Sequence, residues 1–89
     1  MKVVTYTLLL HPCVARLAVA MQNKLWANTH KGGWHKCALR WLRARVVSET
    51  LEMVQAPDED VWREAADVAN FAMMYADRRT GRTRKENET

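Results

Sequence analysis

Residues 48–71 read SETLEMVQAPDEDVWREAADVANF, and this stretch decides the fold because it joins two helical patterns through one short break. The first pattern places Glu49 and Glu52 three residues apart, and the second places Glu64 and Asp67 at the same spacing. On an α-helix this spacing puts both carboxylates on neighbouring turns of one face. The break contains a proline, so we expect an antiparallel hairpin in which the two acidic pairs face each other.

Apolar residues at helical spacing extend this pattern along the chain. We predict three helices, over about 12–27, 35–55 and 59–79. Pro12 suits the first position of the first helix, and a loop that contains Gly32 and Gly33 follows that helix. The apolar side of the second helix carries Leu39, Leu42, Val46, Met53 and Val54. Residues 2–10 fit a short strand, an extended arm or the lead-in to a helix.

The third predicted helix is apolar on nearly every side. Its middle, AADVANFAMMYA, contains only Asp67 and Asn70 as polar residues. Such a helix must be buried nearly all round, and two further helices are too few to cover it. We therefore predict an all-α fold, a helical bundle of about three helices per chain that is completed by oligomerisation. Residues 1–79 form the single domain, and 80–89 form a basic tail that we expect to be disordered.

Length and composition limit the protein class. The chain has 89 residues, enough for one domain at most, and its net charge of +4 favours an anionic partner or substrate. Two cysteines are few for a small secreted domain, so we expect free thiols in a reducing cytoplasm. No segment has about 18 uninterrupted apolar residues, so we expect a cytoplasmic protein without a membrane partner.

The four acids predict a site for a hard cation. Converging carboxylates repel each other unless they are protonated or neutralised by a metal, and all-oxygen ligands suit Mg²⁺, with Mn²⁺ as the alternative. Asp67 lies in the most apolar stretch, where an unpaired carboxylate is costly. Acidic pairs at this spacing also occur on ordinary solvated helix faces. Arg45, four residues before Glu49, is expected to pair with that residue.

The paired motif resembles a known family. Glu49-x-x-Glu52, eleven residues, then Glu64-x-x-Asp67 is similar to the signature of MazG-type all-α nucleoside triphosphate pyrophosphohydrolases, which include dimeric dUTPases and dCTP pyrophosphatases. The words KLWANTHKGGWHKC and EAADVANFAMMYADR resemble small MazG-like proteins common in bacteriophage genomes, and the resemblance covers about residues 11–79.

The resemblance implies an enzyme that converts an NTP or dNTP to the monophosphate and pyrophosphate. It implies that the four acids are catalytic and hold Mg²⁺, and that two or four chains assemble into the bundle as a homodimer or homotetramer. A phage-encoded member would work in the host cytoplasm. Nucleic acid is not expected as a partner of such an enzyme.

Further residues are candidates for substrate binding. Lys24, Lys31 and Lys36 bracket the diglycine loop, where they would contact a triphosphate or remain ordinary surface lysines. Trp34 would stack on a base or anchor the core. Asn70 follows Asp67 by one turn and needs a hydrogen-bonding partner: a base, a sugar hydroxyl, a metal-bound water or the carbonyl of a neighbouring helix.

Other functions remain open. His11-x-Cys13 and His35-x-Cys37 contain zinc-ligating residue types, but their spacing matches no recognised zinc motif. A small basic phage-type protein would bind nucleic acid or a host protein through the basic cluster at 78–85 and exposed tryptophans. A relative that has lost turnover would bind a nucleotide without cleaving it.

Overall fold

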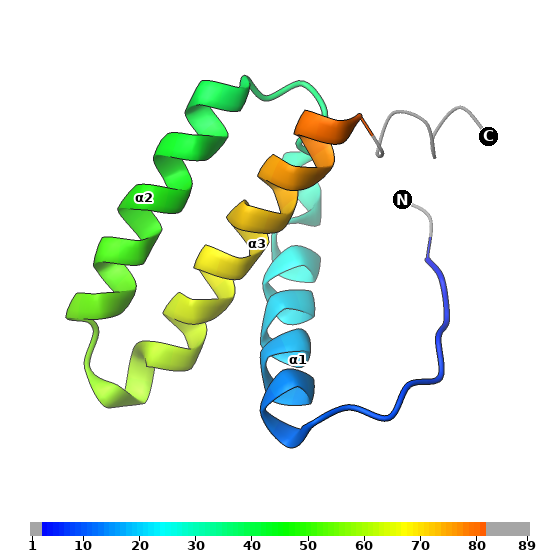
Figure 1. Cartoon of the computed structure of the whole chain (residues 1–89), viewed down its shortest axis with the longest axis vertical. Coiled ribbons are helices and arrows are strands. Elements are labelled where there is room, and N and C mark those ends of the chain that lie inside the picture. The colour runs from blue at the N-terminus through cyan, green and yellow to red at the C-terminus, as the bar shows by residue number, and fades with distance from the viewer. Residues whose placement is uncertain (1–2, 82–89) are drawn as a thin grey trace.

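The computed structural model describes residues 3–81, and it contains three α-helices. These are α1 (Pro12–Ala27), α2 (Leu39–Gln55) and α3 (Val61–Thr80), with short 3-10 turns at Thr29–Lys31 and Asp58–Asp60. The described part of the chain has no strand. The predicted all-α fold with three helices is therefore confirmed (Figure 1).

The first helix has the predicted bounds. Pro12 occupies its first turn, where the missing N–H costs no hydrogen bond. His11 caps this end, because its Nδ1 accepts a hydrogen bond of 3.1 Å from the backbone N–H of Cys13. Residues 3–10 precede the helix as an exposed segment with neither helix nor strand, which corresponds to the extended arm among the three alternatives (Figure 1).

The second helix begins four residues later than its predicted start at 35. The reason is a turn, in which the N–H of Cys37 donates to the carbonyl oxygen of Trp34 at 3.0 Å. Ala38 then has extended backbone angles, with φ −68° and ψ 139°, and serves as the N-cap. The preceding 3-10 turn ends at Gly32, whose φ of 80° lies in the left-handed region that favours glycine.

The third helix differs from its prediction at both ends. Residues 58–60 form a 3-10 turn rather than the first α-helical turn, so α3 begins at Val61. At the other end α3 includes Thr80 and stops at Gly81, which has a φ of 72°. The first residue of the predicted tail, Thr80, belongs to α3 and Gly81 caps it, and the remaining tail residues, 82–89, lie outside the described residues.

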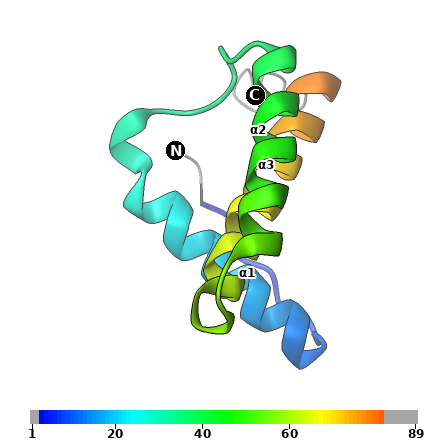
Figure 2. The same cartoon turned by 90° about the vertical axis from the view of Figure 1, so that its left-hand side faces the viewer.

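Helix α3 is the centre of the fold. It packs against α2 as an antiparallel hairpin and against α1, which crosses it, whereas α1 and α2 do not contact each other (Figures 1 and 2). Leu42 of α2 and Ala66 of α3 are completely buried. Every other apolar residue within 3–81 is at least partly accessible to solvent. The core therefore lies mainly between α2 and α3.

Much of the apolar side-chain surface of this chain is accessible to solvent. The large side chains of the apolar middle of α3 are only half-buried: Phe71, Met73, Met74 and Tyr75. Within residues 3–81, no helix combines the length and the apolar character that crossing a lipid bilayer requires. The exposed surface is consistent with the oligomer expected from the sequence, which stays a prediction.

Candidate metal centre

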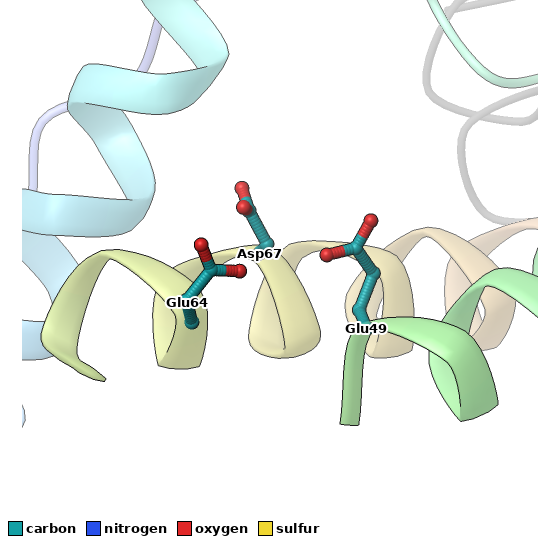
Figure 3. Close-up of side chains that lie close together, drawn as sticks. All are labelled: Glu49, Glu64 and Asp67. Atoms are coloured by element: carbon teal, nitrogen blue, oxygen red, sulfur yellow. The ribbon is translucent and has the colours of Figure 1, made fainter. Parts of the chain in front are cut away.

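Three of the four predicted carboxylates meet in one cluster. Glu49 comes from α2, and Glu64 and Asp67 come from consecutive turns of α3. One oxygen from each of these side chains lies within 4.8 Å of the others. Figure 3 shows the three carboxyl groups on the same side of the α2–α3 hairpin. The hairpin thus brings together acids that are separated in sequence.

The members of the cluster differ in exposure. Glu49 is only 4% exposed, because it lies on the side of α2 that packs against α3. Its Oε2 atom is buried and has no hydrogen-bonding partner. The side chains of Glu64 and Asp67 are 19% and 22% exposed, so the cluster opens to solvent on one side. Burying a carboxylate oxygen without a partner lowers the stability of the fold. A ligand that binds to this oxygen would remove that cost, so Oε2 of Glu49 marks a candidate ligand position.

Each carboxylate of the cluster pairs with one cation. The pairs are Arg45 with Glu49, Lys24 with Asp67 at 3.3 Å, and Arg63 with Glu64 at 3.9 Å. The expected contact between Arg45 and Glu49 is confirmed. These cations offset part of the negative charge of the cluster, which favours the close approach of the acids, and Arg63 is shared with Asp60 at 3.3 Å. This compensation concerns charge only, since Oε2 of Glu49 still has no partner.

The protonation of Glu49 depends on its surroundings. Burial raises the pKa of its carboxyl group above the ordinary value of 4.5. The carboxylate of Glu52 raises this pKa further, through its negative charge and as a hydrogen-bond acceptor for protonated Glu49, whereas the positive charge of Arg45 lowers it. Asp67 also raises the pKa of Glu49 through its negative charge. A cation that binds here has to compete with a proton on Glu49.

Glu52 lies beside the cluster rather than in it. Its carboxyl group is close enough to Glu49 to affect the pKa of that residue, but it does not belong to the group of three acids. Glu52 is exposed, whereas Glu49, three residues before it on α2, is buried. The structure thus assembles a three-acid site with a fourth carboxylate at its edge.

The donor atoms fit a hard cation. Ions with metal–oxygen distances of about 2.1–2.5 Å join oxygens that are up to about 4–5 Å apart, which is comparable to the spread of this cluster. All the donors are carboxylate oxygens, the type that Mg²⁺ and Mn²⁺ prefer. The unpartnered Oε2 of Glu49 provides a further oxygen donor. Glu49, Glu64 and Asp67 are therefore the residues that would hold the ion.

Two of the predicted substrate-binding residues lie near the carboxylates. Lys24 of α1 contacts Asp67 directly. Asn70 is 4% exposed, and its Nδ2 donates a hydrogen bond of 3.1 Å to the carbonyl oxygen of Met21 in α1. Of the alternative partners for Asn70, the structure thus contains the carbonyl of a neighbouring helix. Its Oδ1 atom is also buried and has no partner.

The diglycine loop lies away from the carboxylates. Trp34 donates a hydrogen bond of 2.9 Å from Nε1 to Oδ2 of Asp77. Asp77 is ten residues beyond Asp67 on α3, a distance of about 15 Å along the helix. Trp34 therefore anchors the loop at the far end of α3. Lys31 and Lys36 are exposed, and neither forms an ion pair within the described chain.

Sequence reasoning did not identify Arg63 as a residue of this site. Besides Glu64, its guanidinium contacts Asp60 at 3.3 Å. Arg63 and Lys24 also line a hollow of about 330 Å³ between α1 and α3, together with Ala20, Asn23 and Ala27. The only sequence signal for Arg63 was its position directly before Glu64. The hollow could not be predicted, because the spacing of the acids does not show how α1 crosses α3.

The histidine and cysteine residues form no comparable site. Among residues 3–81, no His or Cys belongs to a group of three or more ligating side chains. Cys13 is an exposed free thiol, and His11 caps a helix. Comparisons with family models, curated proteins and solved structures found no match to this chain. We therefore infer a function from the residues of the chain and their geometry.

Proposed function

We propose that this chain is a metal-dependent nucleoside triphosphate pyrophosphohydrolase of the MazG type. The observation that carries the proposal is Glu49, a buried carboxylate whose Oε2 has no partner and which converges with Glu64 and Asp67. The same acids form the motif that resembles the family, and they come from an antiparallel helical hairpin, as the motif requires.

The carboxylates have the role of metal ligands in this proposal. Glu49, Glu64 and Asp67 would hold Mg²⁺, or alternatively Mn²⁺, and Glu52 at the edge of the cluster is the fourth ligand that the motif implies. When bound, the ion stabilises negative charge on the phosphates and activates the attacking water. The buried position of Glu49 keeps its side chain in one orientation, so the site needs little rearrangement to accept a ligand.

Lys24 and Arg63 have one role in the metal-free site and another in the proposed metal-bound site. Without metal, Lys24 and Arg63 neutralise Asp67 and Glu64. With a divalent ion held by the carboxylates, Lys24 and Arg63 would be bound less tightly by Asp67 and Glu64 and would be free for other contacts. Both cations also line the hollow between α1 and α3, which supports a role for them in binding phosphate oxygens. We therefore add Arg63 to the substrate-binding residues, beside Lys24.

The assembly and location follow from the same proposal. A homodimer or homotetramer would cover the apolar surface that one chain leaves exposed. The host cytoplasm is the place of action if the protein is phage-encoded, where nucleoside triphosphates and Mg²⁺ are both abundant.

The test is pyrophosphate release from a panel of ribo- and deoxynucleoside triphosphates in the presence of Mg²⁺. We expect Glu49→Gln and Asp67→Asn to abolish the release, because each removes a ligand charge while keeping the side-chain shape. Glu59→Gln is the matched control, since Glu59 is an exposed acid outside the cluster. Equal activity of wild type and cluster variants on every nucleotide would refute the proposal.

A second candidate function is nucleotide binding without turnover. It is supported by the cations of the site, because each cluster carboxylate already has a cationic neighbour and the site does not need the metal that turnover requires. Calorimetry separates the two functions. Tight binding of a triphosphate without any release of pyrophosphate would support the binding function and exclude the enzyme.

A further inference from the structure

The outer face of α2 carries an apolar stripe that this chain leaves uncovered. The stripe consists of Ala44, Val47, Leu51 and Val54, all exposed, with the last three 60%, 58% and 72% accessible. Their spacings of three, four and three residues place them on one side of the helix. In Figure 2, α2 lies in front of α3, and no described element covers the side of α2 that faces the viewer.

This stripe is separate from the core-facing side of α2. Leu42 and Glu49 are buried against α3, and they lie on the opposite side of the helix. Helix α2 is therefore apolar on two opposite faces, whereas an ordinary surface helix has one apolar face and one polar face. Alternating spacings of three and four residues are those of a coiled-coil seam, which packs against another helix.

Charges at the two ends of the stripe indicate the partner. Arg40 and Arg43 lie near the start of α2, and Asp58 and Glu59 follow its end. All four are exposed, and none forms an ion pair within residues 3–81. A second α2 in antiparallel orientation would place the basic end of each copy beside the acidic end of the other. A parallel orientation would place like charges together, which is unfavourable.

We propose that a second copy of this chain occupies the stripe, with the two α2 helices packed antiparallel about a two-fold axis near residue 49. This register places Val47 opposite Leu51 of the other copy, because these positions are equally distant from the axis. It likewise places Ala44 opposite Val54, and it brings Arg40 near the start of α2 close to Asp58 and Glu59, which follow the end of the other copy's α2. At each end of the stripe the small Ala44 thus faces the larger Val54, and opposite charges lie beyond these pairs. The proposal does not depend on the enzymatic function.

The first experiment measures the mass of the full chain by sedimentation, with and without one charge in the stripe. We expect the wild type to form dimers or a multiple of dimers, and Val47→Glu to lower the assembly state by dissociating this interface. Val19→Glu is the matched control, since Val19 on α1 is 61% exposed against 60% for Val47 but lies outside the stripe. A wild type that is monomeric at every concentration, or dissociation by Val19→Glu alone, would overturn the proposal.

The second experiment tests the register and uses variants that leave the apolar residues intact. Arg40→Asp and Asp58→Arg should each weaken the dimer about two- to fivefold, because each places like charges opposite one another at the exposed edge of the seam. The double variant restores opposite charges across the interface and should recover the wild-type dissociation constant. Additive weakening in the double variant would contradict this antiparallel register.

Discussion

Replacement of Lys24 tests whether the cations and a metal ion compete for the same carboxylates. Lys24 lies 3.3 Å from Asp67, and its side chain is 35% exposed. In Lys24→Gln the cluster keeps three carboxylates but only two cations. We expect the metal-free protein to lose stability and the affinity for Mg²⁺ or Mn²⁺ to increase, because the ion no longer competes with an ammonium group.

The size of both effects follows from the geometry of the pair. Two unit charges at this distance attract by about 1 kcal/mol in a water-like dielectric. Exposed pairs measured in proteins contribute about 0.2–1 kcal/mol after side-chain ordering and screening, which is the appropriate range for a lysine that is one third exposed. The dissociation constant of the metal should therefore fall about 1.5- to 5-fold. The free energy of unfolding without metal should fall by about 0.2–1 kcal/mol.

The assays are isothermal titration with Mn²⁺ and urea unfolding in the presence of a chelator. Lys31→Gln is the control, because it makes the same change in net charge at an exposed lysine that pairs with no acid in the described chain. The control removes any general effect of charge on metal affinity. Weaker metal binding by Lys24→Gln than by Lys31→Gln would refute the idea that Lys24 and the metal compete.

Three further changes have expected outcomes. Leu42→Ala should lower the free energy of unfolding by about 2–5 kcal/mol in urea titrations, because Leu42 is completely buried; a loss below 1 kcal/mol would contradict its place in the core. Trp34→Phe should cost about 1–2 kcal/mol through the lost hydrogen bond to Asp77, and Trp26→Phe, at an exposed tryptophan, should cost less. The raised pKa of Glu49 favours its protonated form in the folded state, so its contribution to stability is complete below pH 4.5 and is lost as the pH rises through the folded-state pKa. Without metal, Glu49→Gln should therefore become more stable relative to wild type as the pH rises above 4.5 through the folded-state pKa of Glu49, and a constant difference would exclude this titration.

Helix positions could be predicted well from the sequence where local chemistry determines them. Pro12 fixes the start of α1, and the bounds of that helix agree with the prediction. The start of α2 is later than predicted because a hydrogen-bonded turn at Trp34 and the extended Ala38 lie within a stretch that has no proline or glycine signal. The α3 boundary at Val61 differs because acidic residues suit the first turn of a 3-10 helix and of an α-helix alike.

The candidate site could be predicted only in part. The pairing of Glu49 with Glu64 and Asp67 follows from helical periodicity and from one hairpin. The contact of Lys24 with Asp67 depends on how α1 crosses α3, which is set by tertiary packing rather than by spacing. The separation of Trp34 from the acids has the same origin, because the contact between Trp34 and α3 joins residues that are far apart in the chain.

Mn²⁺ binding measured by electron paramagnetic resonance tests the central claim most directly, because it detects the ion at the carboxylates and needs no substrate. We expect one strongly bound ion per chain in the wild type, and loss of that ion in Glu49→Gln and Asp67→Asn but not in Glu59→Gln. Bound metal should also stabilise the wild type, by about 2.7 kcal/mol at a metal concentration of 100 times the dissociation constant. No bound Mn²⁺, or binding that both cluster variants retain, would contradict the metal site and the function proposed from it.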